Sequence, residues 1–318
     1  MSEPNAEPTV WPMSAQLYAP IALFVYNRPA HAKQTVASLL GNREAASSDL
    51  FVFSDGARSA EDAVAVEQVR SWMRELTGFA SVTVIEREEN LGLADSIISG
   101  VSQLCGDAGR VIVIEDDLIL SPYFLRYMND GLARYADAPE VASIHGYTYP
   151  VDCGLPATFF LRGADCWGWA TWSRAWQVFE PDAANLLANL HEQGLERDFD
   201  LDGAGPYIKM LEDFIVGKNN SWAVRWHAAT YLRGMFTLYP GKSLVQNIGI
   251  DGSGTHSGAL DTYRSELADR AVAVDSIEIS ENRMAREAFR RYFESIRPGI
   301  VGRISRRLKD LIQLADKT

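Results

Sequence analysis

The stretch that most constrains the fold is the apolar run 111–114, which is followed directly by Glu115, Asp116 and Asp117. Four β-branched residues in a row are typical of a strand that is buried on both faces, as at the centre of a parallel sheet flanked by helices. The three acids then lie where the strand leaves the sheet, and in open α/β sheets ligands bind at that edge. Clustered carboxylates there can hold a hard divalent cation and, through it, a phosphate. An acidic strand exit without a metal is the alternative interpretation.

Composition limits the class of protein. The chain has 318 residues and 47% hydrophobic content, enough for one large domain or two small ones. It contains no apolar run of membrane-spanning length, and its N-terminus lacks the features of a signal peptide, so we expect a cytoplasmic protein. A net charge of −12 argues against nucleic-acid binding, which depends on cationic groups. The three cysteines are not spaced as metal ligands, which disfavours a zinc site.

An alternation of strands and helices predicts an α/β fold with a mostly parallel, Rossmann-like sheet flanked by helices. The expected strands are 21–26, 49–53, 81–86 and 111–115, with helices at 31–40, 60–76 and 93–104 between them. Further along we expect helices at 122–135, within 182–214, at 221–232 and at 282–296, and strands at 141–144, 236–239 and 271–279. Residues 1–18 are predicted to be a flexible lead-in.

Polar residues follow each of the first four strands. They are Asn27 and Arg28 after the first strand, Asp55 after the second, Arg87, Asn90 and Gly92 after the third, and the acidic trio after the fourth. Each alone could be turn chemistry. Because the carboxyl ends of parallel strands share one edge of the sheet, we interpret the four together as a binding site.

Tryptophans are dense at Trp167, Gly168 and Trp169, and Trp222 follows later in the chain. Indoles in such density often form core. A Trp-Gly-Trp loop can also stack on the apolar faces of sugar rings, and its glycine lets a ligand approach the backbone. Both interpretations stay open.

Two later segments carry further hypotheses. The Gly-rich loop 247–256 includes Asp251 and His256 and could close over a ligand, or could be an ordinary surface loop. Residues 300–314 are amphipathic with a local cluster of arginines and a lysine, which suggests peripheral contact with an anionic inner-membrane surface. A helix packed on the domain, or a dimer contact, is the alternative.

Four motifs in this order resemble a known family. They are the strand ending Asn-Arg-Pro (27–29), the strand ending Ser-Asp-Gly (54–56), the Arg-x-x-Asn-Leu-Gly segment (87–92) and the strand entering Glu-Asp-Asp (115–117). Together they look like a GT-A-fold glycosyltransferase, most similar to N-acetylglucosaminyltransferase I and to bacterial family-two-like sugar transferases, over roughly residues 19–258. The resemblance implies a GT-A domain at 19–265, with a nucleotide-binding half (19–120) and an acceptor half (121–265), followed by a C-terminal extension with a strand and amphipathic helices (266–318).

The resemblance also implies roles for residues. Asp117, with His256 as a further ligand, would hold Mn²⁺ or Mg²⁺ on the donor diphosphate, and Asp116 and Glu115 would lie on the ribose and sugar sides. Asp55, Asn27 and Arg28, with Arg87, Asn90 and Gly92, would bind the rest of the donor. Trp167, Gly168, Trp169 and Trp222 would contact the acceptor or the sugar.

An inverting transferase needs a carboxylate that takes the proton of the acceptor hydroxyl. In the resembled family this acid lies just before a Trp that begins a helix, a position that falls near Asn220 and Trp222 here. Asn220 is neutral and cannot be this base. The nearest acids are Glu212 and Asp213, with Asp251 in reserve, and we take Asp213 as the predicted base.

The leading prediction is a metal-dependent, inverting glycosyltransferase that moves a sugar from a nucleotide-diphosphate sugar, UDP-sugar favoured, to a glycan or lipid-linked acceptor in bacterial surface polysaccharide synthesis. One alternative is a nucleotide-sugar-binding or scaffold protein with impaired catalysis, which the neutral Asn220 favours. Another is a sugar nucleotidyltransferase. That class carries a Gly-rich, basic loop after its first strand, whereas this chain has Tyr-Asn-Arg-Pro-Ala at 26–30.

Overall fold

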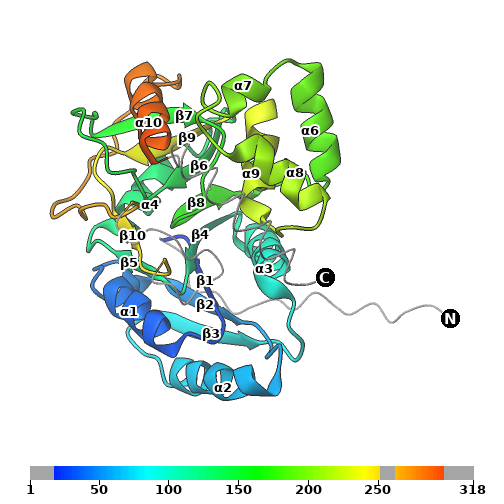
Figure 1. Cartoon of the computed structure of the whole chain (residues 1–318). Coiled ribbons are helices and arrows are strands. Elements are labelled where there is room, and N and C mark those ends of the chain that lie inside the picture. The colour runs from blue at the N-terminus through cyan, green and yellow to red at the C-terminus, as the bar shows by residue number, and fades with distance from the viewer. Residues whose placement is uncertain (1–17, 251–261, 297–318) are drawn as a thin grey trace, which may run out of the picture.

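The computed structural model describes residues 18–250 and 262–296. A central sheet lies between two layers of helices (Figure 1). In chain order the elements are β1 (Ile21–Val25), α1 (Pro29–Leu40), the 3₁₀ helix η1 (Ala45–Ser47), β2 (Asp49–Ser54), α2 (Ala60–Arg74), β3 (Ser81–Glu86), α3 (Gly92–Ala108), β4 (Arg110–Glu115), β5 (Leu118–Leu120), α4 (Phe124–Arg134), β6 (Val141–His145), β7 (Thr158–Arg162), β8 (Trp169–Trp172), α5 (Ser173–Trp176), α6 (Ala183–Glu192), α7 (Glu196–Phe199), α8 (Tyr207–Ile215), α9 (Trp222–Leu232), β9 (Phe236–Pro240), β10 (Val245–Asn247) and α10 (Arg283–Ile296).

The first half of the chain forms the predicted parallel sheet. Its strands lie in the order β3-β2-β1-β4, and every neighbouring pair is parallel. Strand connections of this kind are right-handed, so the chain moves outward through α1 and α2 over one face and returns to β4 through α3 over the other. The predicted α/β class with a mostly parallel sheet flanked by helices is confirmed.

The second half extends the same sheet in the order β8-β6-β9-β7 beyond β4. Strand β8 runs antiparallel to β4 and to β6, and Val113 lies opposite Trp169 in the register. Strand β7 runs antiparallel to β9, and β9 runs parallel to β6, so β7 and β8 point the same way. Residues 163–168 join the end of β7 to the start of β8. These six residues must therefore run across a face of the sheet, from the amino ends of β6 and β9 to the carboxyl end of β6.

The core explains why β4 reads as a continuous apolar run. Val111 to Ile114 are at most 1% exposed, because β1 and β8 flank the strand and helices cover both of its faces. One hydrophobic cluster runs through both halves of the sheet, from Ile21 to Ala268. Strand β4 thus ends at the middle of the molecule, and the acids that follow it begin there.

The C-terminal part differs from the prediction. No strand forms at 271–279, and the isolated bridge that follows joins Glu281 to Phe160. The alternating apolar residues Val272 and Val274 pack against the core without a partner strand, so the alternation reflected burial on one side rather than pairing. The predicted strand in the extension 266–318 is therefore wrong, whereas its first helix is confirmed as α10.

Two further points concern the helices. The helical stretch expected within 182–214 is divided into α6, α7 and α8, with glycines at 194, 203 and 205 in the connections. The amphipathic segment 300–314 lies outside the described residues. None of the helices in the described ranges combines the length and apolarity that crossing a bilayer requires.

Candidate functional site

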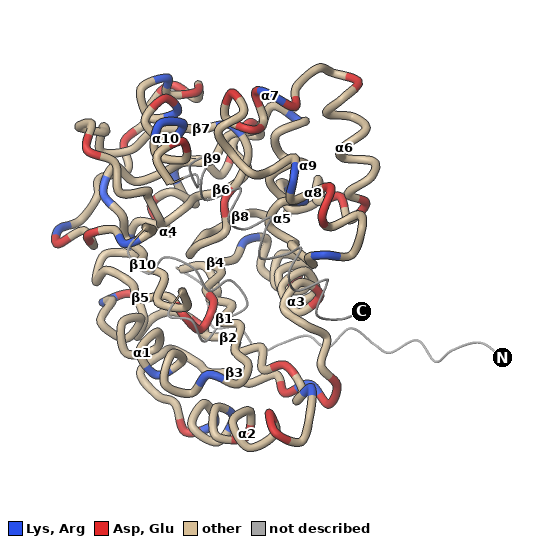
Figure 2. Tube along the Cα trace, in the orientation of Figure 1, with Lys and Arg blue, Asp and Glu red and all other residues tan. Residues whose placement is uncertain are grey.

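The polar residues that follow β1, β2, β3 and β4 share one edge of the sheet, as the parallel pairing requires. In Figure 2 an acidic stretch follows the end of β4 and lies between β1 and β5. The sequence therefore predicted correctly which strand exits meet. Their detailed contacts show what each side chain does at this edge.

The acidic trio is fixed by contacts from β1 and α1. The Asp116 carboxylate accepts the backbone N–H of Tyr26 at 3.2 Å, and its carbonyl accepts the hydroxyl of Thr35 at 2.8 Å. Arg28 donates to the Asp117 carboxylate at 3.1 Å, with both side chains under 20% exposed. The β4 exit and the β1 exit are thereby joined by one ion pair and one hydrogen bond, and a second hydrogen bond joins the β4 exit to α1.

Strand β10 closes the site from the other side. It pairs antiparallel with β5, and the backbone N–H of Ile248 donates to the carbonyl of Asp117 at 2.8 Å. Arg28 also donates to the carbonyl of Gly249 at 3.3 Å. A Cβ at Gly249 would lie 1.9 Å from the Asp117 carboxylate, so only glycine allows the backbone to approach this closely.

The three carboxylates of the trio are buried close together, which raises their pKa values. Burial, and next the neighbouring carboxylates of Asp117 and Asp116, raise the pKa of Glu115 well above its ordinary value. Burial and the charge of Asp117 raise the pKa of Asp116 to about 7. Burial also raises the pKa of Asp117, although Arg28 opposes this. A bound cation would relieve the repulsion, and the diphosphate of a ligand could bridge it to Arg28.

The carboxylates of Asp116 and Asp117 would supply only part of the ligands of a magnesium or manganese ion. Among the described residues, no three His, Cys, Asp or Glu side chains converge as a ready-made metal site. Mg²⁺ is commonly held by one or two carboxylates together with substrate phosphates rather than by a complete protein cage. Asp116 and Asp117 offer such a partial set. The predicted ligand His256 lies outside the described residues.

Asp55 holds the loop that follows β3. Its carboxylate is 5% exposed and accepts backbone N–H groups from Gly56 at 3.0 Å, Leu91 at 2.9 Å and Gly92 at 2.8 Å. The Asn90 side chain donates to the carbonyl of Gly56 at 2.7 Å. The predicted donor residues Asp55, Asn90 and Gly92 therefore lie together. Through its backbone contacts Asp55 shapes the edge of the sheet where β2 and β3 end, which we call the rim.

Arg87 lies beside this loop. Its guanidinium donates to the hydroxyl of Ser99 at 2.8 Å, and burial lowers its pKa. Its second terminal nitrogen is buried without a hydrogen-bond partner in the described part of the chain. It therefore retains a donor at the rim.

Two residues of α2 that support this rim were not predicted. Arg70 donates to the carbonyls of Asp55 at 3.1 Å and Arg87 at 2.7 Å. One side chain of α2 thus connects the exits of β2 and β3. Asp62 accepts the Asn27 amide at 2.6 Å and the Tyr26 hydroxyl at 2.9 Å. Asp62 follows the N-cap residue Ser59 by three residues, a spacing typical of a helix N-terminus. The sequence therefore indicates a place in the first turn of α2 but gives no sign of the contact with β1.

The tryptophans divide between core and rim. Trp169 is fully buried at the start of β8 and stacks on the buried Trp222 at 5.4 Å between ring centroids, so both belong to the core alternative. Trp167 is partly exposed and packs edge-on against Tyr147. The backbone N–H of Gly146 donates to the carbonyl of Gly168 at 2.7 Å, which holds the end of the 163–168 segment at the carboxyl edge.

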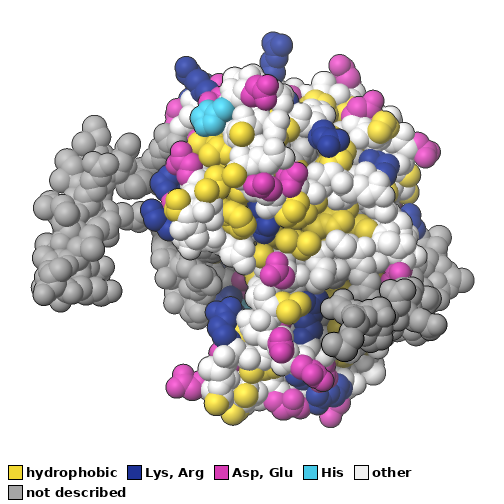
Figure 3. Space-filling view, turned by 90° about the vertical axis from the view of Figure 1, so that its right-hand side faces the viewer, with side chains coloured by type: hydrophobic (Ala, Val, Ile, Leu, Met, Phe, Trp, Pro, Cys, Tyr) yellow, Lys and Arg dark blue, Asp and Glu magenta, His cyan; other side chains and the backbone are white. Residues whose placement is uncertain are grey.

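The predicted base Asp213 lies on α8, whose end carries exposed Ile215 and Val216. Hydrophobic side chains gather across the middle of this side of the molecule (Figure 3). The Asp213 carboxylate pairs with Lys209 and, at 3.8 Å, with Lys218, and these contacts lower its pKa. Within the described residues, its carboxylate forms no hydrogen bond or ion pair with the acidic trio. Ion pairing of this kind makes a carboxylate a weaker proton acceptor.

Comparisons with known proteins bear on the assignment of this site. A search of curated proteins finds no match. A crystal structure of S. aureus TarS is similar at 14% identity over 47% of this chain and 25% of that chain, with a TM-score of 0.31. A crystal structure of S. aureus TarS 1–349 is similar at 11% identity over 74% of this chain and 61% of that chain, with a TM-score of 0.40. The chain thus spans less than two thirds of either.

The family comparison is more direct. Residues 21–154 match the model of glycosyl transferase family 2, and this range contains the four polar strand exits and the acidic trio. The closer resemblance to N-acetylglucosaminyltransferase I stays a prediction. This similarity to glycosyl transferase family 2 covers less than half of the chain, and it supports an assignment of the protein as a glycosyltransferase.

Proposed function

We propose that this chain transfers a sugar from a nucleotide-diphosphate sugar, a UDP-sugar in the first instance, to a hydroxyl of a glycan or lipid-linked acceptor in bacterial surface polysaccharide synthesis, with inversion at the anomeric carbon. The observation that carries the proposal is the pairing of Asp117 with Arg28 where β4 and β1 leave the sheet. A carboxylate can hold a metal ion, and a neighbouring guanidinium can bind the diphosphate on that ion. The pair therefore suits a metal-bound diphosphate better than a neutral ligand.

Each group at the rim has a task in this reaction. Asp116 and Asp117 would hold Mn²⁺ or Mg²⁺, which supplies charge neutralisation for the leaving diphosphate. Arg28 would donate to a phosphate oxygen in place of Asp117. The loop held by Asp55, with Asn27, Arg87 and Asn90 around it, would bind the nucleoside. Trp167 and Gly168 lie just before β8, at the same edge of the sheet, and would border the transferred sugar.

The proposal is tested by donor binding. Asp117→Ala should reduce the Mn²⁺-dependent affinity for UDP at least tenfold in titration calorimetry, because it removes both a metal ligand and the partner of Arg28. Asp107→Ala, an exposed acid at the end of α3, is the matched control and should bind UDP as the wild type does. An unchanged affinity in Asp117→Ala would contradict the proposal.

A second candidate, a donor-binding protein with impaired catalysis, rests on the neutral Asn220, which is exposed just before α9. Release of UDP from a panel of UDP-sugars, measured with p-nitrophenyl glycosides as acceptors, distinguishes the two. Turnover well above the rate without enzyme supports a transferase, whereas tight UDP binding without turnover supports the second candidate.

A further inference from the structure

The segment 163–168 between β7 and β8 is held by two buried histidines. The backbone N–H of Ala164 donates to Nδ1 of His227, and that of Trp167 donates to Nε2 of His145, each at 3.1 Å. A ring nitrogen that accepts a hydrogen bond carries no proton, so both imidazoles act here in the neutral form. Burial lowers the pKa of His145, and it lowers that of His227 to about 4. The crossing segment is therefore fixed at both of its ends.

Asp165 lies between these two clamped points. Its Oδ1 accepts the backbone N–H of Cys166 at 2.8 Å, and the Tyr149 hydroxyl lies 3.5 Å from its Oδ2. Nδ1 of His145 is 4.0 Å from the same Oδ2. Within residues 18–250 and 262–296, Asp165 forms no ion pair with a lysine or arginine. Its side chain is 23% exposed, so it is a positioned carboxylate without a cationic partner that a ligand can still reach.

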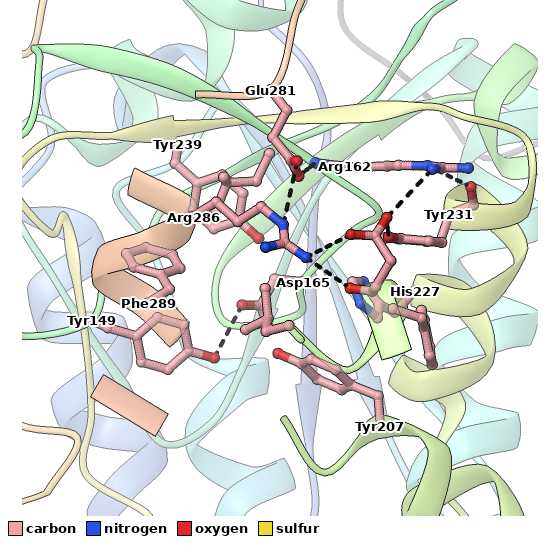
Figure 4. A pocket seen from close by; sticks show the side chains of 14 residues that line it. Tyr149, Arg162, Asp165, Tyr207, His227, Tyr231, Tyr239, Glu281, Arg286 and Phe289 are labelled. Carbon is pink, nitrogen blue, oxygen red and sulfur yellow. Dashed lines mark hydrogen bonds and ion pairs between the residues drawn. The ribbon is translucent and has the colours of Figure 1, made fainter. Parts of the chain in front are cut away.

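A small pocket opens in front of this carboxylate. Figure 4 shows Asp165 between the rings of Tyr149 and Tyr207, with Phe289 of α10 and His227 of α9 on the walls. The cavity is about 30 Å³, which is room for a water molecule or one hydroxyl group but not for a sugar ring. Aromatic rings make up much of the lining, and its charged members besides Asp165 are Arg162, Asp198, Glu281 and Arg286. Such a lining suits the edge of a saccharide, whose C–H groups pack on rings while its hydroxyl groups are hydrogen-bonded.

Asp165 is also close to the proposed donor site. Residues Trp167 and Gly168 lead directly into β8, which pairs with β4 near its carboxyl end. Burial raises the pKa of the Cys166 thiol well above its ordinary value, and the charges of Asp165, Glu115 and Asp117 add to this effect. Cys166 is thus within electrostatic reach of Asp165 and of the acidic trio at once.

We propose that Asp165 is the general base of the transfer and that the pocket of Tyr149, Tyr207 and Phe289 receives the edge of the acceptor saccharide. This inference rests on the proposed function and assigns the proton acceptor that Asn220 cannot be. In the step, the acceptor oxygen forms a bond to the anomeric carbon of the donor and gives its proton to the Asp165 carboxylate. The bond from the anomeric carbon to the diphosphate oxygen breaks, and the nucleoside diphosphate leaves with that electron pair. Asp165 then returns the proton to solvent.

The geometry favours Asp165 over the base predicted from the sequence. Asp213 forms ion pairs with Lys209 of α8 and with Lys218 beyond its end, whereas Asp165 forms no ion pair with any described lysine or arginine. Asp165 is fixed by backbone contacts of its own segment to β6 and α9, which is the kind of support that a catalytic group requires.

The test separates catalysis from donor binding. Asp165→Asn keeps the size of the side chain and an oxygen for the Cys166 N–H but cannot accept a proton. We expect kcat for UDP release from UDP-sugars, with p-nitrophenyl glycosides as acceptors, to fall at least 100-fold, as removal of a general base commonly causes. Mn²⁺-dependent UDP affinity should stay within threefold of the wild type, and Asp165→Glu should recover part of the rate.

Asp152→Asn, which changes an exposed acid of the neighbouring loop, is the control and should leave kcat unchanged. The assignment is overturned if Asp165→Asn retains kcat within threefold of the wild type. It is equally overturned if the variant raises the KM for the donor while keeping kcat, since Asp165 would then hold the donor sugar. Failure of the wild type to bind UDP with Mn²⁺ would instead overturn the proposed function, and the base assignment with it.

Discussion

The Asp55 carboxylate accepts the backbone N–H of Gly92 at 2.8 Å, which joins the exit of β2 to the first residue of α3. Gly92 has a positive φ of 77°, a conformation that glycine adopts without strain. The contact therefore fixes where α3 begins relative to the sheet. The shape of this part of the sheet edge also depends on Asp55, a buried carboxylate that already accepts hydrogen bonds from three backbone N–H groups.

Replacing Asp55 by Asn tests this arrangement. The amide can keep one oxygen for the N–H groups of Gly56 and Leu91, but its NH₂ group then faces the N–H of Gly92, and two donors meet. We expect the free energy of unfolding to fall by about 1–3 kcal/mol and UDP affinity to fall with it. Urea unfolding and calorimetry measure the two effects. Glu88→Gln, at an exposed site of the same loop, should change neither.

Gly249→Ala tests the close approach of the β10 end to the acidic trio. The added Cβ would lie 1.9 Å from an Asp117 carboxylate oxygen and 3.0 Å from a nitrogen of Arg28, so their ion pair must shift. We expect a loss of Mn²⁺-dependent UDP affinity of at least tenfold, measured by calorimetry.

Gly106→Ala is the matched control for that substitution. This glycine lies within α3, and a Cβ there meets nothing within 4 Å. Alanine should raise stability by about 0.5–1 kcal/mol and leave UDP affinity unchanged. Equal UDP affinity in the two variants would show that the contact of Gly249 with Asp117 has no part in binding.

The buried His227 makes stability depend on pH. Burial lowers its pKa to about 4, whereas an unfolded histidine titrates near 6.5, so the unfolded chain binds more protons between these values. The stabilising contribution is complete above about pH 6.5 and is lost as the pH falls towards 4, to the extent of about 3 kcal/mol.

His227→Asn isolates this contribution, because the amide oxygen can replace Nδ1 as acceptor for the Ala164 N–H. Urea unfolding at pH 7.5 and pH 4.5 should show a smaller loss of stability in the variant than in the wild type. His191→Asn, at a 60% exposed site, should retain the wild-type difference. An identical pH dependence in His227→Asn would rule out the neutral, buried state of this ring.

Arg286 anchors α10 to the rest of the fold. Its guanidinium is 15% exposed and pairs with Asp198 at 2.6 Å, Asp202 at 2.5 Å and Glu281 at 3.4 Å. Arg286→Met would remove this cation from three acids whose side chains are 48%, 43% and 31% exposed, and we expect a loss of about 1–2 kcal/mol in the free energy of unfolding, because solvent screens such pairs. Hydrogen exchange should accelerate across α10. Arg291→Met, at a 73% exposed site on the same helix, should cost less than about 0.5 kcal/mol.

The sequence identified the parallel half of the sheet because its signals are local. Each strand is a short buried run with polar residues at its end, and each helix repeats its apolar residues with the helical period. The acidic trio was recognisable for the same reason, because a charge directly after a buried strand can only lie at the sheet edge. The contact between Arg28 and Asp117 follows from the adjacency of β1 and β4.

Non-local contacts were beyond the same reasoning. Trp169 begins a strand, but its neighbours Gly168 and Trp167 made the stretch look like a loop. Asp165 stands in an irregular segment, and its surroundings come from His145 and His227, which are 20 and 62 residues away in the sequence. Only the crossing of this segment over the sheet brings the three together. An acid between two aromatic-rich stretches was the signal that the sequence offered.

Strand β4 lies between β1 and β8, so the two halves of the sheet cannot be separated without exposing one edge of this strand. A fragment that stops near residue 120 would leave the β8-facing edge of β4 open along its most apolar strand, a template for aggregation. The two halves of the sheet, β3-β2-β1-β4 and β8-β6-β9-β7, therefore cannot be exchanged separately between proteins. Hybrids that aim to change the acceptor should keep β4 and β8 from one parent and exchange loops at the sheet edge instead.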